Sequence, residues 1–355
     1  MDKNERLINI ELLRVLAMFL IIIGHVLGDD HGNVLSRLEP KSLSWCVLWG
    51  IETISVIATN IYILISGFFL SGSEFRPKRI LKICVQVWFY SVIFGICSLL
   101  TDKFSIQTAL NMLTPVLHRT WWFVSSYIGM VMISPLLNKI ILGMENSELK
   151  GSIIVCLVMF SFIPTLYPIT DTFSIGGGTG IVWFATVYLV AGYIRKNKKQ
   201  LSDNGLESKW KWIYLAVFMT MFSSKMLLTV VTERVFGRAI GTSIFYTNNS
   251  PICFLGAVSV FMMFLSMKSD GFSKLIRIIA KTGSLTFGIY LIHNNPFFSK
   301  RLWRILSPGT ERGTVFLVLQ VFAISIFIYI LCGLIDYLRE LLFGNLINQW
   351  KRRSA

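Results

Sequence analysis

Hydrophobic residues in this chain gather in long runs instead of alternating with polar ones. Ten such runs recur along the whole chain, most of them about 20 residues long, which is typical of a chain that crosses a bilayer repeatedly. The runs predict ten membrane-spanning helices at residues 8–28, 45–70, 80–100, 121–142, 151–169, 181–194, 212–231, 251–267, 283–303 and 314–338. The predicted fold class is therefore an all-α polytopic membrane protein, a bundle of about ten transmembrane helices.

The composition agrees with this class. Of 355 residues, 54% are hydrophobic and only 15% are charged, so a soluble core could not hide the apolar side chains. Residues 1–7 are short and mixed in charge, and no small-residue cleavage site follows, so the first run is not predicted to be a cleavable signal. The sequence shows no internal repeat and no soluble appendage. We predict one membrane domain over residues 1–355, with no appended soluble domain.

Lysine and arginine residues indicate how the helices are oriented. An even number of spans puts both termini on one side, and the ends and loops of that side hold 22 of the 34 basic residues, against 10 in the opposite loops. The positive-inside rule therefore predicts that both termini are cytoplasmic. The net charge of +15 is explained by a basic rim that faces anionic lipid, with room for one anionic ligand, and no nucleic-acid partner is implied.

The first span carries three ionisable residues on one helical face. Glu11, Arg14 and His25 fall within about 60° of one another at about 100° per residue, and Arg14 and His25 lie about 16 Å apart along the axis. Charged groups inside a membrane are costly, so they mark function by default. A snorkelling arginine and a histidine bonded between helices would be the structural alternative. Three groups on one stripe favour function.

Other candidate residues follow along the chain. Arg76, Arg79 and Lys82 begin the third span, where guanidinium groups and free backbone N–H groups suit a phosphate, although an ordinary positive-inside loop explains them equally well. Ser66 precedes Gly67 in the second span, a pair that favours close helix packing over a nucleophile. The six cysteines lie in apolar runs without metal-ligand spacing, so no metal site is predicted.

Aromatic and amide side chains supply the remaining candidates. Trp122 opens the fourth span, where an aromatic belt or a sugar-stacking platform would explain it. Tyr290, His293 and Asn294 lie in the outer part of the ninth span and are too polar to face lipid. They are predicted to line a cavity or to pair with other helices.

These motifs together resemble the acyltransferase-3 family of bacterial integral-membrane acyltransferases, which commonly modify cell-surface carbohydrates. The resemblance covers most of the chain and depends on five motifs in order: R-x10-H, SGF, R-x-x-R, Trp-Phe with a later proline, and YLIH. Here they are Arg14 with His25, Ser66–Phe68, Arg76 with Arg79, Trp122-Phe123 with Pro135, and Tyr290–His293. One departure is Glu11, where members often carry aspartate three residues before the arginine.

The resemblance implies a multi-pass protein of the bacterial inner membrane that transfers an acyl group, usually acetyl, from cytoplasmic acyl-CoA to a carbohydrate hydroxyl at the cell surface. Acetyl-CoA would be a co-substrate, with no permanently bound cofactor. Arg76, Arg79 and Lys82 would hold the CoA phosphates, and His25 would act as general base, because imidazole exchanges a proton near neutral pH. Arg14, paired with Glu11, would hold charge near the donor or fix the geometry of the helix, and Tyr290, His293, Asn294, Trp122 and Ser66 would contact the substrates.

Two other functions use similar residues. A transporter or flippase of a glycan or amphipathic substrate also places arginine, histidine and glutamate in the membrane, but the sequence shows no inverted repeat and no matched pair of broken helices. A third possible function is that of a scaffold subunit in a polysaccharide-assembly complex, but no feature of the sequence favours it. The sequence leaves open whether the protein forms a homo-oligomer or joins such a complex.

The charge asymmetry generates a topology prediction. Reporter fusions after Gln200 and after Ser269 are expected to read cytoplasmic, and a fusion after Asn33 is expected to read external. Paired cytoplasmic and periplasmic reporters at each position make the measurement. An external reading at Gln200 would overturn the orientation.

Overall fold

The structure is a computed structural model that describes residues 8–28, 31–99, 105–198, 201, 206–267 and 272–353. Every regular element within these residues is a helix. Leu100, the predicted end of the third span, and the fusion points Gln200 and Ser269 lie outside the described residues.

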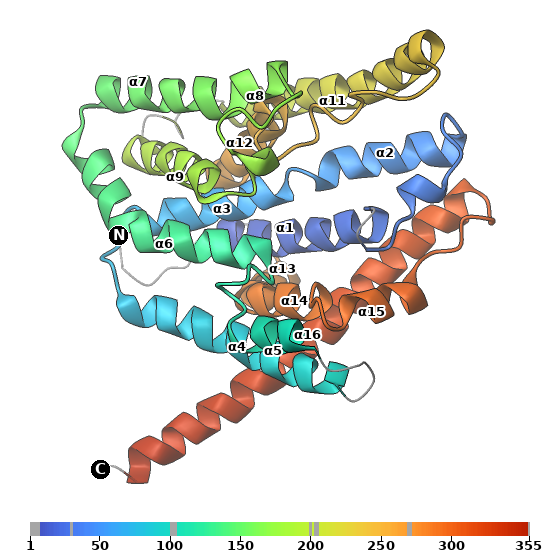
Figure 1. The fold of residues 1–355 in the computed structure, drawn as a ribbon. Helices are drawn as coiled ribbons and strands as arrows, with labels where there is room; N and C mark the ends of the chain where they lie inside the picture. The colour runs from blue at the N-terminus through green and yellow to red at the C-terminus, as the bar shows by residue number, and fades with distance from the viewer. Residues whose placement is uncertain are drawn as a thin grey trace.

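The helices follow one another along the chain and run roughly side by side (Figure 1). The α-helices are α1 Ile8–Leu27, α2 Leu43–Ser55, α3 Ala58–Leu70, α4 Pro77–Leu99, α5 Ile106–Leu113, α6 Trp122–Gly143, α7 Asn146–Leu157, α8 Ile163–Leu166, α9 Ile181–Lys196, α11 Leu206–Phe236, α12 Pro251–Ser266, α13 Lys274–Lys281, α14 Thr286–His293, α15 Ser299–Leu306 and α16 Thr314–Arg353. The short turns are η1 Leu35–Arg37, η2 Val158–Phe162, η3 Gly176–Gly178 and η4 Thr282–Leu285.

Eight of the ten predicted spans form helices long and apolar enough to cross a membrane, which confirms the fold class. The sixth and eighth predicted spans form α9 and α12, which have only 16 residues each. At 1.5 Å per residue such a helix is about 24 Å long, shorter than a hydrocarbon core of about 30 Å. Both short helices pack against α3 and bury most of their side chains.

The ninth span was predicted at the wrong position. It was expected at residues 283–303, but the membrane-length segment is Lys274–His293, built from α13, η4 and α14. The helix ends because Asn294 leaves the helical conformation and Pro296 cannot continue a helix. Residues Ser299–Leu306 then form the separate helix α15. The sequence window joined two segments that the Asn-Asn-Pro turn divides.

Helix α1 lies at the centre of the bundle (Figure 1). It packs against α2, α3, α12, α13, α14 and α16. Ile10, Leu13, Ala17 and Ile22 of α1 are completely buried, so apolar packing holds the helix on several sides. Because helices pack against α1 on several sides, its polar residues lie mainly among protein side chains. In Figure 1, α1 begins and α16 ends at the same end of the bundle.

Two glycines allow neighbouring helices to approach closely. A Cβ atom on Gly67 would lie 2.9 Å from the Cβ of Ala191, which confirms that the serine-glycine pair of the second span serves helix packing. A Cβ atom on Gly288 of α14 would lie 2.0 Å from the Asp336 carboxyl carbon of α16. The same Asp336 accepts a hydrogen bond of 2.7 Å from the Tyr90 hydroxyl of α4. These contacts hold α14 in place between α4 and α16.

Candidate active site

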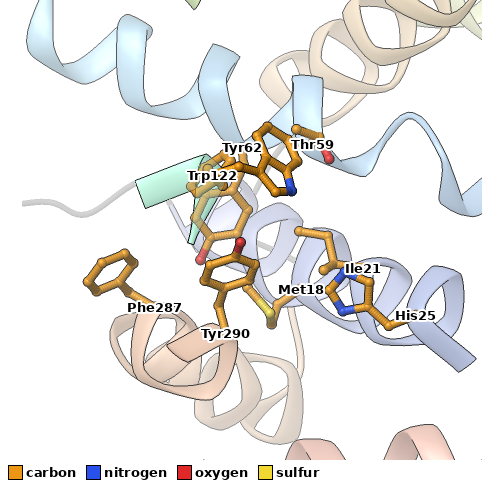
Figure 2. A pocket seen from close by; sticks show the side chains of 9 residues that line it. Met18, Ile21, His25, Thr59, Tyr62, Trp122, Phe287 and Tyr290 are labelled. Atoms are coloured by element: carbon orange, nitrogen blue, oxygen red, sulfur yellow. The ribbon is translucent and has the colours of Figure 1, made fainter. Parts of the chain in front are cut away.

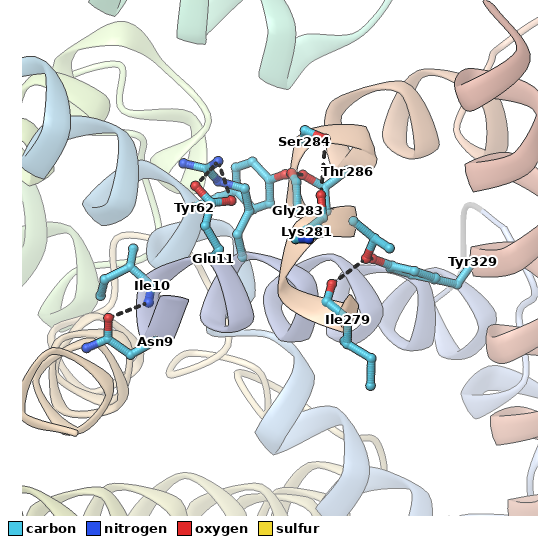
Figure 3. Close-up of polar contacts among 12 residues, drawn as sticks. Asn9, Ile10, Glu11, Tyr62, Ile279, Lys281, Gly283, Ser284, Thr286 and Tyr329 are labelled. Carbon is cyan, nitrogen blue, oxygen red and sulfur yellow. Dashed lines mark hydrogen bonds and ion pairs between the residues drawn. The ribbon is translucent and has the colours of Figure 1, made fainter. Parts of the chain in front are cut away.

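The ion pair near the N-terminal end of α1 has the predicted partners. Nη1 of Arg14 lies 3.1 and 3.0 Å from the two carboxylate oxygens of Glu11, and the Glu11 residue is only 7% exposed. Turn η4 comes so close that a Cβ atom on Gly283 would lie 2.5 Å from Oε2 of Glu11. Figure 3 shows Glu11 facing this turn. Glu11, which stands where family members often carry the smaller aspartate, thus forms the ion pair with Arg14 and packs against η4.

A chain of hydroxyl groups connects α3 to the same turn. The Tyr62 hydroxyl donates to Oγ1 of Thr286, and Thr286 in turn donates to the Gly283 carbonyl at 2.8 Å (Figure 3). Because the Tyr62 hydrogen is committed to Thr286, its oxygen is left as an acceptor. Tyr62 therefore joins α3, α14 and η4 in the middle of the bundle.

Three of the four histidines converge at the C-terminal end of α1. Nδ1 of His25 lies 2.9 Å from Nε2 of His293, and the ring of His31 stacks on that of His25 at 4.2 Å between ring centroids. Nε2 of His31 lies 2.6 Å from the amide oxygen of Asn294. His293 is completely buried, whereas His25 and His31 are partly exposed. The more accessible end of the cluster is therefore the His25 and His31 end.

The hydrogen bonds determine which nitrogen of His25 is unprotonated. Nδ1 of His293 lies 2.7 Å from the Ile289 carbonyl, which can only accept, so Nδ1 of neutral His293 carries the proton. Nε2 of His293 is then an acceptor, and Nδ1 of His25 must donate to it. Nε2 of neutral His25 is consequently unprotonated. One backbone carbonyl thus leaves His25 with a free lone pair, as a general base requires.

His25 also lines a small cavity between α1, α3, α6 and α14. The cavity has a volume of about 30 Å³, and its lining includes Met18, Tyr62, Trp122 and Tyr290. Figure 2 shows these side chains gathered around one space with His25 at its side. The buried Tyr290 hydroxyl has Asn294 as a polar neighbour but completes no hydrogen bond among the described residues. Neutral His25, with its unprotonated Nε2, and Tyr290 therefore line the same space.

Of the three predicted anion-binding residues, the structure places Arg76 and Arg79 together and Lys82 apart from them. Arg79 lies 3.4 Å from the Ser73 hydroxyl, and it lines with Arg76 a narrow cleft of about 10 Å³ between the turn before α4 and helix α6. Lys82 is exposed and does not line this cleft. Arg195 of α9 lies nearby and donates to the Phe68 carbonyl at 2.7 Å, where α3 ends. Sequence reasoning missed Arg195, which adds positive charge to this end of the bundle.

The remaining predicted residues differ in how near they lie to His25. Trp122 and Tyr290 line the cavity, and His293 and Asn294 belong to the histidine cluster. Ser66 is one helical turn beyond Tyr62 on α3 and is not among the residues that line the cavity. It lies on the side of Tyr62 that leads toward Arg76 and Arg79. The structure thus brings together four of these five residues.

Sequence reasoning also missed His31. It lies in a loop six residues after His25, and nothing in the hydrophobic pattern points to it. The scarcity of histidine was the available signal, since the chain has only four and two of them were already candidates. Among the described residues, no group of three or more histidine, cysteine, aspartate or glutamate side chains is arranged to hold a metal ion. The stacked rings of His25 and His31 do not converge on one point as metal ligands would.

The fold and the site define a polytopic membrane protein whose central helix presents a histidine to an internal cavity. The family model described as an acyltransferase domain matches residues 7–340, nearly the whole chain. The chain therefore belongs to this acyltransferase family, and the resemblance seen in the sequence motifs is confirmed. It is a multi-pass membrane acyltransferase. Comparison with curated proteins and with solved structures finds no match.

Proposed function

We propose that the protein transfers an acetyl group from acetyl-CoA on the cytoplasmic side to a hydroxyl of a cell-surface or exported carbohydrate. The observation that carries the proposal is the unprotonated Nε2 of His25 beside a cavity that also contains the Tyr290 hydroxyl. Membership of the acyltransferase family supports acyl transfer in general. The donor, the acceptor and the roles of the residues are the parts that we add.

The proposed reaction is direct transfer. Nε2 of His25 accepts the proton of the carbohydrate hydroxyl while the oxygen of that hydroxyl attacks the carbonyl carbon of the thioester. The Tyr290 O–H donates to the carbonyl oxygen as negative charge develops on it. The tetrahedral intermediate then expels the CoA thiolate, which takes the proton from the His25 imidazolium. The products are a carbohydrate ester and free CoA, and His25 returns to its starting state.

The size of the cavity supports acetyl as the transferred group. A space of about 30 Å³ holds roughly two water molecules, so a two-carbon acyl group fits where a longer chain would displace Met18 or Trp122. The nucleotide would remain near the cytoplasmic end, where Arg76 is exposed and Arg79 lines the narrow cleft. The pantetheine arm would follow the polar stripe of α1 past Arg14, whose distance from His25 along the axis is about 16 Å.

Substitution of the donor site tests the first half of the proposal. Arg76→Ala and Arg79→Ala are expected to raise the KM for acetyl-CoA by tenfold or more, because each loses a charge-assisted phosphate contact worth about 1.5–3 kcal/mol. Lysine at either position should restore part of the loss, since the charge returns without the guanidinium fork. Lys82→Ala is the matched control and should have little effect, because Lys82 does not line the cleft. Wild-type CoA affinity in both alanine variants would contradict the assignment.

A histidine series tests the base. His25→Gln is expected to lower acetyl transfer by about 10² to 10⁴, the usual contribution of a general base, while CoA binding persists. His118→Gln serves as the control, because His118 is exposed and lies outside the cluster. Transfer and CoA binding are measured separately on purified, membrane-reconstituted protein. Near wild-type turnover in the His25 variant, beside an inactive His293→Gln variant that binds both substrates, would move the base to α14.

A further inference from the structure

A second, larger space lies at the opposite end of the bundle from Arg76 and Arg79. This space, the outer cleft, has a volume of about 350 Å³ and opens where α1 ends and α2 begins. The cleft is on the side that the charge asymmetry predicts to be external. Its volume falls in the range of about 300–1,000 Å³ that is typical of small-molecule sites. Its lining includes Gly28, which directly follows α1, Trp45, Trp49 and Glu52 of α2, and Lys225 and Thr229 of α11.

Two polar groups of the outer cleft have no hydrogen-bond partner among the described residues. They are the indole N–H of Trp49 and the hydroxyl of Thr229, and the Thr229 residue is only 3% exposed. A buried polar group without a partner costs free energy, so each one in a folded protein needs an explanation. Both residues line the same cleft although they come from different helices. A ligand that brings its own hydroxyl groups would satisfy both.

The charged groups of the outer cleft are held in fixed positions. Nζ of Lys225 lies 3.6 Å from the centre of the Trp49 ring and donates to the Thr242 and Ser243 hydroxyls at 2.9 and 3.1 Å. The Glu52 carboxylate accepts from the Ser55 hydroxyl at 2.9 Å. These contacts hold Lys225 against the Trp49 indole and Glu52 against Ser55.

This combination matches the chemistry of a sugar. A sugar ring has apolar C–H faces that pack on aromatic rings, and a rim of hydroxyl groups that both donate and accept. Trp45 and Trp49 supply the aromatic surface, with ring centroids 6.0 Å apart. A more open cleft of about 590 Å³ shares Glu233 with the outer cleft and leaves room for the rest of a longer glycan.

The outer cleft also borders the helix that carries His25. Gly28, which lines the cleft, is three residues beyond His25, or about 4.5 Å along the axis. A Cβ atom on Gly24 would come within 3.7 Å of Oγ of Ser55 and 3.8 Å of Oε2 of Glu52, so α2 packs against α1 just before His25. The outer cleft therefore lies beside the end of α1 that carries His25.

From this geometry we infer that the outer cleft is the binding site for the carbohydrate acceptor, with Trp49 and Thr229 as its recognition residues. The inference rests on the proposed acetyl transfer and adds the place and the chemistry of acceptor recognition. Trp49 and Thr229 hydrogen-bond the sugar hydroxyls, and the glycan extends along the surface away from His25. Neither residue takes part in the chemical step.

The test measures acceptor recognition separately from donor turnover. Purified protein is supplied with acetyl-CoA, and with surface polysaccharide from cells that lack this gene, freed of esters by mild alkali. Trp49→Phe keeps the aromatic ring and Thr229→Val keeps the shape, but each removes one hydrogen-bonding group. We expect each to raise the KM for polysaccharide several-fold to about tenfold. Thiol release from acetyl-CoA without polysaccharide, in which water takes the place of the carbohydrate hydroxyl, should remain at the wild-type rate.

Matched controls come from the exposed surface of α11. Trp212→Phe and Thr220→Val make the same chemical changes at exposed positions and should leave the KM unchanged. Wild-type KM values in both cleft variants, or a parallel loss of acceptor-independent thiol release, would overturn the inference. Thiol release by the wild type with no transfer to polysaccharide would overturn it too. No thiol release from the wild type at all would contradict the proposed function itself.

Discussion

The hydrogen bond between His25 and His293 is the interaction on which the account of this site depends. It joins the central helix α1 to α14, and through the Ile289 carbonyl it determines the tautomer of both rings. The requirement behind it is general in a membrane protein, because a polar group surrounded by apolar side chains must find a partner. In most soluble enzymes a carboxylate orients the catalytic histidine. In this protein a second histidine and a backbone carbonyl orient His25, the proposed base, without adding a charge.

The same requirement explains which polar groups are structural. Glu11 with Arg14, Tyr62 with Thr286 and Asp336 with Tyr90 each connect a helix to its neighbour or to its own next turn. Some buried groups have no hydrogen-bond partner among the described residues, and three of them line the two spaces discussed here. Tyr290 lines the internal cavity, and Trp49 and Thr229 line the outer cleft. Others, among them Trp121, Ser161 and Ser250, line neither space.

The fold was largely predictable because each membrane-spanning helix corresponds to one continuous run of apolar residues of the right length in the sequence. The ninth span was wrong because a window cannot see that Asn294 and Pro296 end a helix whose apolar residues continue. The site was less predictable. Spacing placed Glu11, Arg14 and His25 on one face, but nothing local links His25 to His31 in a loop or to His293, which lies 268 residues away. The outer cleft forms only when α2 and α11 pack together.

The tautomer of His25 is the most direct test of this account. Solid-state NMR of protein with ¹⁵N-labelled histidine, reconstituted in bilayers at neutral pH, distinguishes protonated from unprotonated ring nitrogens. Comparison with His25→Gln assigns the two signals of that ring among only four histidines. The account predicts a neutral His25 with the proton on Nδ1 and none on Nε2. A proton on Nε2 of neutral His25 would contradict it, because that nitrogen could not then accept the proton of the acceptor hydroxyl.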